Sequence, residues 1–109
     1  MGEQGPATKS KRRADRALVG DYHREKLGEL LEHVRGGFAA YDAGQIDAFE
    51  LDEIIHQYKR AAIELWKFCV GLGSGSGVEI AARAIQSARA EGADRDWWDE
   101  GASSNSRTR

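Results

Sequence analysis

Two apolar stripes on either side of a short turn constrain the fold of this chain more than any other feature. The stripes are formed by Leu27, Leu31, Val34, Phe38 and Tyr41 before the turn and by Leu51, Ile55, Tyr58, Ala62, Leu65 and Cys69 after it. Within each stripe the residues recur at alternating steps of four and three, which places them on one side of an α-helix. The sequence therefore predicts an antiparallel, coiled-coil-like helical hairpin over residues 17–70.

The turn itself, over residues 42–46, carries local signals that support this prediction. Gly44 is free to adopt the left-handed conformation that commonly ends a helix. Asp47 and Glu50 form the D-x-x-E pattern of a capping box, which suits the start of the second helix. The hairpin boundary is therefore specified by the sequence on both sides of the turn.

Folding about this turn brings the two stripes level with each other. The predicted pairs are Phe38 with Leu51, Val34 with Ile55, Leu31 with Tyr58 and Leu27 with Ala62. Gly36 and Gly37 weaken the first helix by roughly 1 kcal/mol each relative to alanine. Tight packing against the second helix is expected to compensate for this loss.

The rest of the chain divides into four segments. Residues 1–16 carry five basic side chains and no apolar anchor, so we expect a flexible basic arm. Residues 71–77 are a Gly/Ser hinge, and residues 78–91 have the apolar spacing of a third, shorter helix. Residues 92–109 are expected to form an acidic Trp-Trp segment and a disordered tail. The predicted fold class is thus all-α with disordered termini.

The second helix has more apolar surface than the first helix can cover. Its apolar arc is roughly 220° wide, whereas a simple surface helix shows about 100°. We expect a second interface, covered by either the third helix or a second subunit, on Ile54, Ala61, Ile63, Trp66 and Phe68.

Trp97 and Trp98 lie next to each other among acidic residues. Two adjacent indoles are costly to leave in water, and tryptophan is enriched in binding hot spots. The pair is expected either to fold back onto the hairpin or to anchor a partner.

The charge balance argues against wholesale binding to nucleic acid or membrane. Sixteen Lys and Arg residues stand against eighteen Asp and Glu residues, giving a formal net charge of −2. A local exception is the basic arm, where phosphate contacts are possible for Lys9, Lys11, Arg12, Arg13 and Arg16.

The sequence predicts neither an enzyme nor a cofactor site. Cys69, the one cysteine, falls within the second stripe, where a lone cysteine is usually a small core residue. Glu53 with His56, and Glu29 with His33, have the residue types of a metal-binding helical bundle. All four lie away from the apolar stripes, so a solvated face is the preferred interpretation. The chain has no apolar run long enough to span a bilayer and no signal peptide, which favours the cytoplasm.

A resemblance covers the stretch from Tyr41 to Cys69, which reads YDAGQIDAFELDEIIHQYKRAAIELWKFC. This stretch is similar to a recurring segment of short uncharacterised helical proteins of high-GC Gram-positive bacteria, and the Trp-Trp acidic tail resembles theirs. The resemblance implies no activity, cofactor or site residue.

We interpret the chain as a non-enzymatic protein–protein interaction module, most simply a homodimer forming a four-helix bundle or a binder of another helical protein. One alternative is a small antitoxin-like regulator that contacts nucleic acid through the basic arm. A second alternative is a metal-binding helical bundle.

Overall fold

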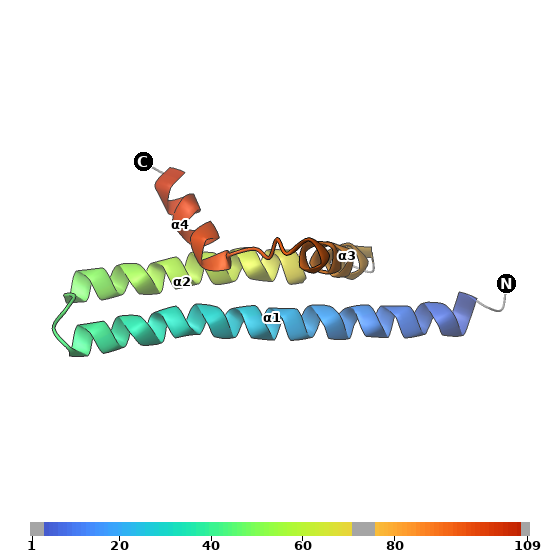
Figure 1. The fold of residues 1–109 in the computed structure, drawn as a ribbon, viewed down its shortest axis with the longest axis horizontal. Helices are drawn as coiled ribbons and strands as arrows, with labels where there is room; N and C mark the ends of the chain where they lie inside the picture. Colours follow the sequence, from blue (N-terminus) through green and yellow to red (C-terminus); the bar gives the residue numbers. More distant parts are fainter. Residues whose placement is uncertain (1–3, 71–75, 108–109) are drawn as a thin grey trace. The chain divides into compact units, whose positions relative to one another are not determined.

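The protein is built from four helices, seen in a computed structural model that describes residues 4–70 and 76–107, with side chains from 9–70 and 77–102 (Figure 1). The helices are α1 (Gln4–Asp42), α2 (Ala48–Cys69), α3 (Ser76–Glu91) and α4 (Trp97–Arg107). The described chain contains no strand, so the all-α prediction is confirmed. Within these ranges, no helix has the length and apolarity needed to cross a membrane.

The chain forms two compact units, and each is assembled from separated stretches of sequence. Unit 1 combines α1 up to Arg24 with the segment from Trp66 to Arg95, which includes α3. Unit 2 combines α1 from Glu25 onward with α2 up to Leu65 and with α4. The predicted hairpin belongs mainly to unit 2, where α2 returns alongside α1 (Figure 1).

The turn between α1 and α2 has the geometry that its sequence predicts. Gly44 has a φ of 76°, and the Gln45 amide donates to the Ala40 carbonyl at 2.9 Å, which closes α1 with a Schellman motif. The Asp47 amide donates to the Glu50 carboxylate, and the Glu50 amide donates to the Asp47 carboxylate, each at 2.9 Å. The capping box is therefore confirmed.

The contact face of α1 within the hairpin differs from the predicted one. Leu30 and Gly37 are buried, whereas Leu31, Phe38 and Tyr41 are exposed. A Cβ atom on Gly37 would lie 3.2 Å from Leu51 and 3.1 Å from Ile54 on α2. Leu51 thus lies opposite Gly37 and not opposite Phe38, so the pairing of α1 with α2 is shifted by one residue along α1 from the predicted pairing. The side of α1 that contacts α2 carries Leu30 and Gly37 where Leu31 and Phe38 were predicted, because a glycine at position 37 allows α2 to approach the backbone closely.

The basic segment at the start of the chain, for which the sequence predicts a flexible arm over residues 1–16, is helical from Gln4 in its described part. Lys11 pairs with Asp15 at 3.1 Å, one helical turn away, and Asp15 is buried. Val19 and Tyr22 are buried in the same part of α1. These residues supply the anchor that composition alone did not reveal.

The predicted segments after α2 agree with the structure only in part. The third helix is confirmed but begins at Ser76, and the other hinge residues, 71–75, lie outside the described residues. Part of the segment predicted as an acidic Trp-Trp stretch and tail is helical, since α4 occupies Trp97–Arg107. The Asp96 carboxylate accepts a hydrogen bond from the Asp99 amide at 3.3 Å, which caps the start of α4.

The core of unit 1 joins α1, the end of α2 and α3. The rings of Tyr22 and Phe68 lie 6.0 Å apart, tilted by 58°. The Arg89 guanidinium lies 5.8 Å from the Tyr22 ring centre, and Arg95 lies 5.5 Å from that of Phe68. The apolar face of α3 is small and buried, with Ala81, Ala82 and Ile85. The third helix therefore packs within the same chain.

Candidate functional site

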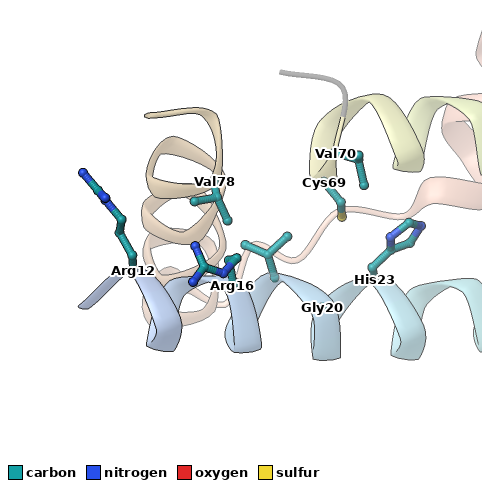
Figure 2. Close-up of a pocket in the computed structure, with 8 residues that line it drawn as sticks. Arg12, Arg16, Gly20, His23, Cys69, Val70 and Val78 are labelled. Atoms are coloured by element: carbon teal, nitrogen blue, oxygen red, sulfur yellow. The ribbon is translucent and has the colours of Figure 1, made fainter. Parts of the chain in front are cut away.

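A pocket of about 540 Å³ lies in unit 1, where α1 meets the end of α2 and the start of α3 (Figure 2). Its lining consists of Arg12, Arg16, Val19, Gly20, His23, Cys69, Val70 and Val78. Small-molecule sites typically measure roughly 300–1,000 Å³ and combine apolar walls with a few polar groups. The pocket has the size and the mixed lining of such a site.

The polar side chains of the pocket come from one side of α1. Arg12, Arg16 and His23 are separated by four and seven residues, and these spacings return to the same face of a helix. Figure 2 shows Arg16 and His23 on the pocket side of α1, with Val78 of α3 nearby. Within the described part of the chain, neither guanidinium forms an ion pair with a carboxylate. The pocket therefore presents two arginines available to an anion.

The structure separates the five basic residues singled out as phosphate contacts. Arg12 and Arg16 line the pocket, whereas Lys11 pairs with Asp15. Lys9 and Arg13 are exposed and line no part of the pocket. His23 was missed as a site residue, although its position seven residues after Arg16 is a signal that sequence reasoning can use.

Cys69 forms part of the pocket wall and is buried. Desolvation by burial raises the pKa of its thiol from 9.0 to about 11. At neutral pH this rise lowers the thiolate fraction about a hundredfold, and the thiolate is the reactive form. The local environment thus makes Cys69 a wall residue with poor nucleophilicity.

We expect Cys69 to react with iodoacetamide at pH 7 at least about a hundredfold more slowly in the native chain than in the denatured chain. Because the folded pKa is raised, the native rate should keep rising with pH beyond 9, where the denatured rate levels off. Alkylation followed by mass spectrometry across a pH series measures both curves. Equal native and denatured rates would contradict the raised pKa.

Unit 2 has an exposed apolar surface, which we call the open face. Its large side chains are Leu31, Phe38 and Tyr41 of α1, which are 45%, 47% and 43% exposed, and Ile63 of α2, which is 53% exposed. Leu31 and Phe38 are one heptad apart. Several large apolar side chains exposed on one hairpin are a feature of interaction surfaces.

The other side of the hairpin in unit 2 is covered by α4. The Trp98 ring stacks on His33, with centroids 4.2 Å apart and planes within 2° of each other. Gln57 donates to the Trp98 carbonyl at 3.0 Å, and the Arg60 Nε donates to the Gly101 carbonyl at 3.1 Å. One side of the hairpin is therefore closed within the chain.

Helical geometry places the open face away from α4. Leu31 precedes His33 by two residues, which sets the two about 160° apart around α1. Ile63 likewise follows Ala61, which lies against Gly101, by two residues on α2. The hairpin of unit 2 thus has one covered side and one open side.

The seven residues predicted to form an interface fall into two groups. Ile54, Ala61 and Phe68 are covered within the chain, since Ala61 is fully buried and the other two are half-buried. Trp97 is buried and Trp98 is half-buried, so both tryptophans fold back onto their own chain. Ile63 and Trp66 are the two that stay exposed.

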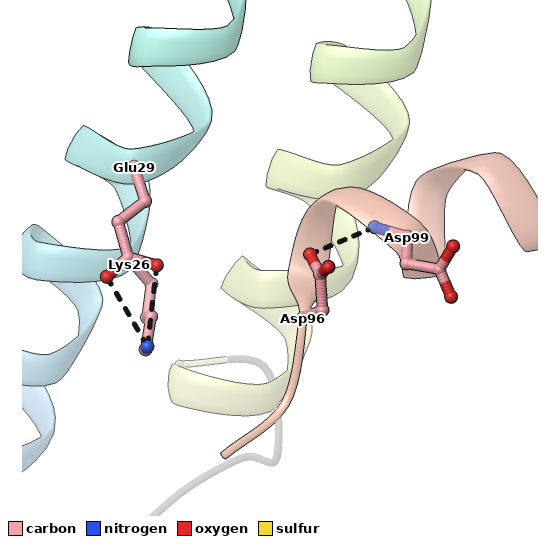
Figure 3. A network of polar contacts seen from close by, with 4 residues as sticks. All are labelled: Lys26, Glu29, Asp96 and Asp99. Atoms are coloured by element: carbon pink, nitrogen blue, oxygen red, sulfur yellow. Dashed lines mark hydrogen bonds and ion pairs between the residues drawn. The ribbon is translucent and has the colours of Figure 1, made fainter.

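The residues considered for a metal site are not brought together as a ligand set. His33 stacks on Trp98, and His56 lies at 2.8 Å from the Asp52 carbonyl and 3.4 Å from its carboxylate. Glu29 pairs with Lys26 at 3.4 Å (Figure 3). Among the residues whose side chains are described, no group of three or more His, Cys, Asp or Glu residues is arranged to hold a metal ion.

Lys26 is a buried charge in unit 2, and it is not part of the apolar stripe predicted for the first helix. Its side chain is 6% exposed, and its ammonium nitrogen lies 3.4 Å and 3.5 Å from the two carboxylate oxygens of Glu29 (Figure 3). Lysine is almost never buried without a partner. The burial of Lys26 therefore marks the true contact side of α1 better than the large apolar side chains do.

Comparisons with known proteins found no matching family model, no similar curated protein and no similar solved structure.

Proposed function

We propose that the protein is a non-enzymatic helical interaction module that self-associates through the open face of unit 2. The observation that carries this proposal is the exposure of Leu31, Phe38 and Ile63 on a hairpin whose other side is covered by α4. Two hairpins that bury such faces against each other form a four-helix bundle. The second copy supplies the cover that the chain itself gives to only one side.

A second copy fits the open face because the residues of α2 on that side are self-complementary. Ala48, Asp52, Ile55 and Lys59 follow one another at steps of four, three and four, which places them on one side of α2. An antiparallel copy of α2, related by a twofold axis between Ile55 and His56, sets Asp52 opposite the equivalent of Lys59. A homodimeric twofold interface repeats each such contact twice.

The same twofold arrangement also matches side-chain sizes. It sets Ile63, which is large and exposed, opposite Ala48, whose side chain is small and also exposed. Asp52, whose carboxylate lies 3.4 Å from His56, and Lys59 are both exposed in the single chain, so that a partner can reach them. Charge and size therefore both favour a second copy as the occupant of the open face.

We expect the protein to have a mass of about 24 kDa in solution, twice that of the 12.0 kDa chain. Phe38→Glu should return it to a single chain, because the interface would have to bury a new carboxylate. Phe38 is half exposed in the hairpin, so the helical content should stay unchanged. Light scattering over a concentration series gives the mass, and circular dichroism checks the fold.

A charge exchange tests the twofold arrangement itself. Lys59→Asp alone should weaken the dimer about tenfold or more, because it faces Asp52 of the second copy with a like charge. Adding Asp52→Lys should restore the dimer. Glu53→Lys is the matched control, since Glu53 is exposed on another side of α2. A wild-type chain that stays single at every concentration, or a double variant no better than Lys59→Asp, would overturn the proposal.

A further inference from the structure

The pocket of unit 1 carries a second inference, which does not rest on self-association. It contains two kinds of surface, a cationic part formed by Arg12, Arg16 and His23 and an apolar part formed by three valines. Among the residues whose side chains are described, no acidic one lines it, so the fixed charge of this lining is positive. A ligand for such a pocket needs a negative end and an apolar body.

The cationic part is suited to an oxyanion. Arg12 and Arg16 lie one helical turn apart, and a guanidinium offers several N–H donors in a planar fork that matches carboxylate and phosphate oxygens. A histidine ring adds a further N–H donor. The two nearby carboxylates of α1 are already paired, Asp15 with Lys11 and Asp21 with Arg24. The two guanidiniums of the pocket are thus left without a carboxylate from this helix.

The apolar part is suited to a hydrocarbon chain. Val19 is buried in the wall, Val78 is half-buried, and Val70 is 50% exposed at the pocket. Cys69, which is buried, adds its thiol to this wall. Gly20 leaves space, because a Cβ there would meet nothing within 4 Å. An alkyl chain in this space would cover the exposed side of Val70.

We propose that this pocket binds a small amphipathic anion, with its carboxylate or phosphate head at Arg12 and Arg16 and its alkyl chain along Val19, Val70 and Val78. Both ends are required. The head supplies charge-assisted hydrogen bonds, and the chain removes apolar wall from water.

Four probes, measured with the full-length protein by titration calorimetry, separate the two ends. Octanoate and octyl phosphate carry both a head and a chain, octan-1-ol carries only the chain, and inorganic phosphate carries only the head. We expect at least one of the first two to bind at least about tenfold more tightly than either single-ended probe. Which of the two binds more tightly identifies the head group that the arginines prefer.

Substitutions locate the binding on the pocket. Arg12→Gln with Arg16→Gln should weaken the binding of the preferred probe at least about tenfold, because each guanidinium supplies charge-assisted hydrogen bonds. Arg13→Gln is the matched control, since it removes the same charge from the same helix at an exposed residue outside the pocket. The bound probe should also slow alkylation of Cys69 in the wall, a readout that surface binding would not move.

Several results would overturn the proposal. These are the absence of binding by both double-ended probes, and binding of octan-1-ol or inorganic phosphate as tight as that of the tighter double-ended probe. An equal loss for Arg13→Gln would show that only the general positive field of α1 matters. Displacement of the bound probe by duplex DNA, with unchanged Cys69 alkylation, would assign the basic residues to a nucleic-acid surface instead.

Discussion

Replacing Trp97 with alanine is expected to lower the free energy of unfolding by about 3–5 kcal/mol, the usual range for a buried tryptophan. Trp97 is 3% exposed and is the first residue of α4. Its indole is the largest side chain that α4 buries, and a tryptophan contributes roughly 150–250 Å² of buried surface. Removing it leaves a cavity that the short α4 helix cannot fill.

Trp98→Ala provides the matched comparison for this prediction. Trp98 is half-buried, and its ring contact is the stack on His33 at 4.2 Å. Such a stack contributes about 0.5–1.5 kcal/mol beyond buried area, so Trp98→Ala should cost clearly less than Trp97→Ala. Urea unfolding followed by circular dichroism avoids the loss of the fluorescent reporter. If Trp98→Ala lowered the free energy of unfolding as much as Trp97→Ala or more, Trp97 would not be the main residue that holds α4 on the hairpin.

Gly101→Ala is expected to destabilise the protein by about 1–3 kcal/mol, although alanine is the better helix former. A Cβ at Gly101 would lie 2.9 Å from the Gln57 carbonyl oxygen and 3.0 Å from the Ala61 amide nitrogen. These are backbone atoms of α2, which cannot move aside as a flexible side chain can. The added methyl group must therefore push α4 away from the hairpin, and the hydrogen bond from Arg60 to the Gly101 carbonyl is lost with it.

Gly36→Ala is the control, because a Cβ there would meet nothing within 4 Å in the interior of α1. It should stabilise the protein by roughly 0.5–1 kcal/mol through helix propensity alone. Chemical unfolding gives both free energies, and amide hydrogen exchange shows whether α4 alone loses protection in Gly101→Ala. If both glycine variants were stabilised, the close approach of α4 to α2 would be excluded.

The parts of the fold that depend on neighbouring residues were predictable from the sequence. Gly44, Asp47 and Glu50 each act within a few residues of their own position, and the structure confirms both the left-handed turn and the capping box. The hairpin follows from this turn because two helices joined so closely must return alongside each other. Local chemistry was sufficient for this step.

The side of α1 that contacts α2 was not predictable in the same way. The sequence predicts that the stripe through Leu31, Phe38 and Tyr41 faces the second helix, because its apolar residues recur at steps of four and three. The actual contact side carries Gly37, which has no side chain to count, and Lys26, which a hydropathy pattern assigns to solvent. Close backbone approach and a paired buried charge are tertiary effects, so spacing alone does not reveal them.

The candidate sites show the same division. The spacing of Arg12, Arg16 and His23 along one helix is readable in the sequence, but the opposing wall of Val70 and Val78 comes from residues more than forty positions away. The helical state of α4 was missed because the residues after Trp98 are small and polar. The close contact of Gly101 with Ala61 explains why a glycine is compatible with that helix.

Because each unit combines stretches that are far apart in the sequence, the order of synthesis on the ribosome affects when each unit can fold. Each unit needs the nearby part of α1 together with a helix that is made much later, α3 for unit 1 and α4 for unit 2. Neither unit is therefore complete while the nascent chain ends within α2, and the growing hairpin exposes both of its apolar sides during that time. Exposed apolar surface on an incomplete chain is what chaperones bind and what leads to aggregation. A chain released early, before α4 is made, leaves Ala61 uncovered and becomes a natural substrate for quality control.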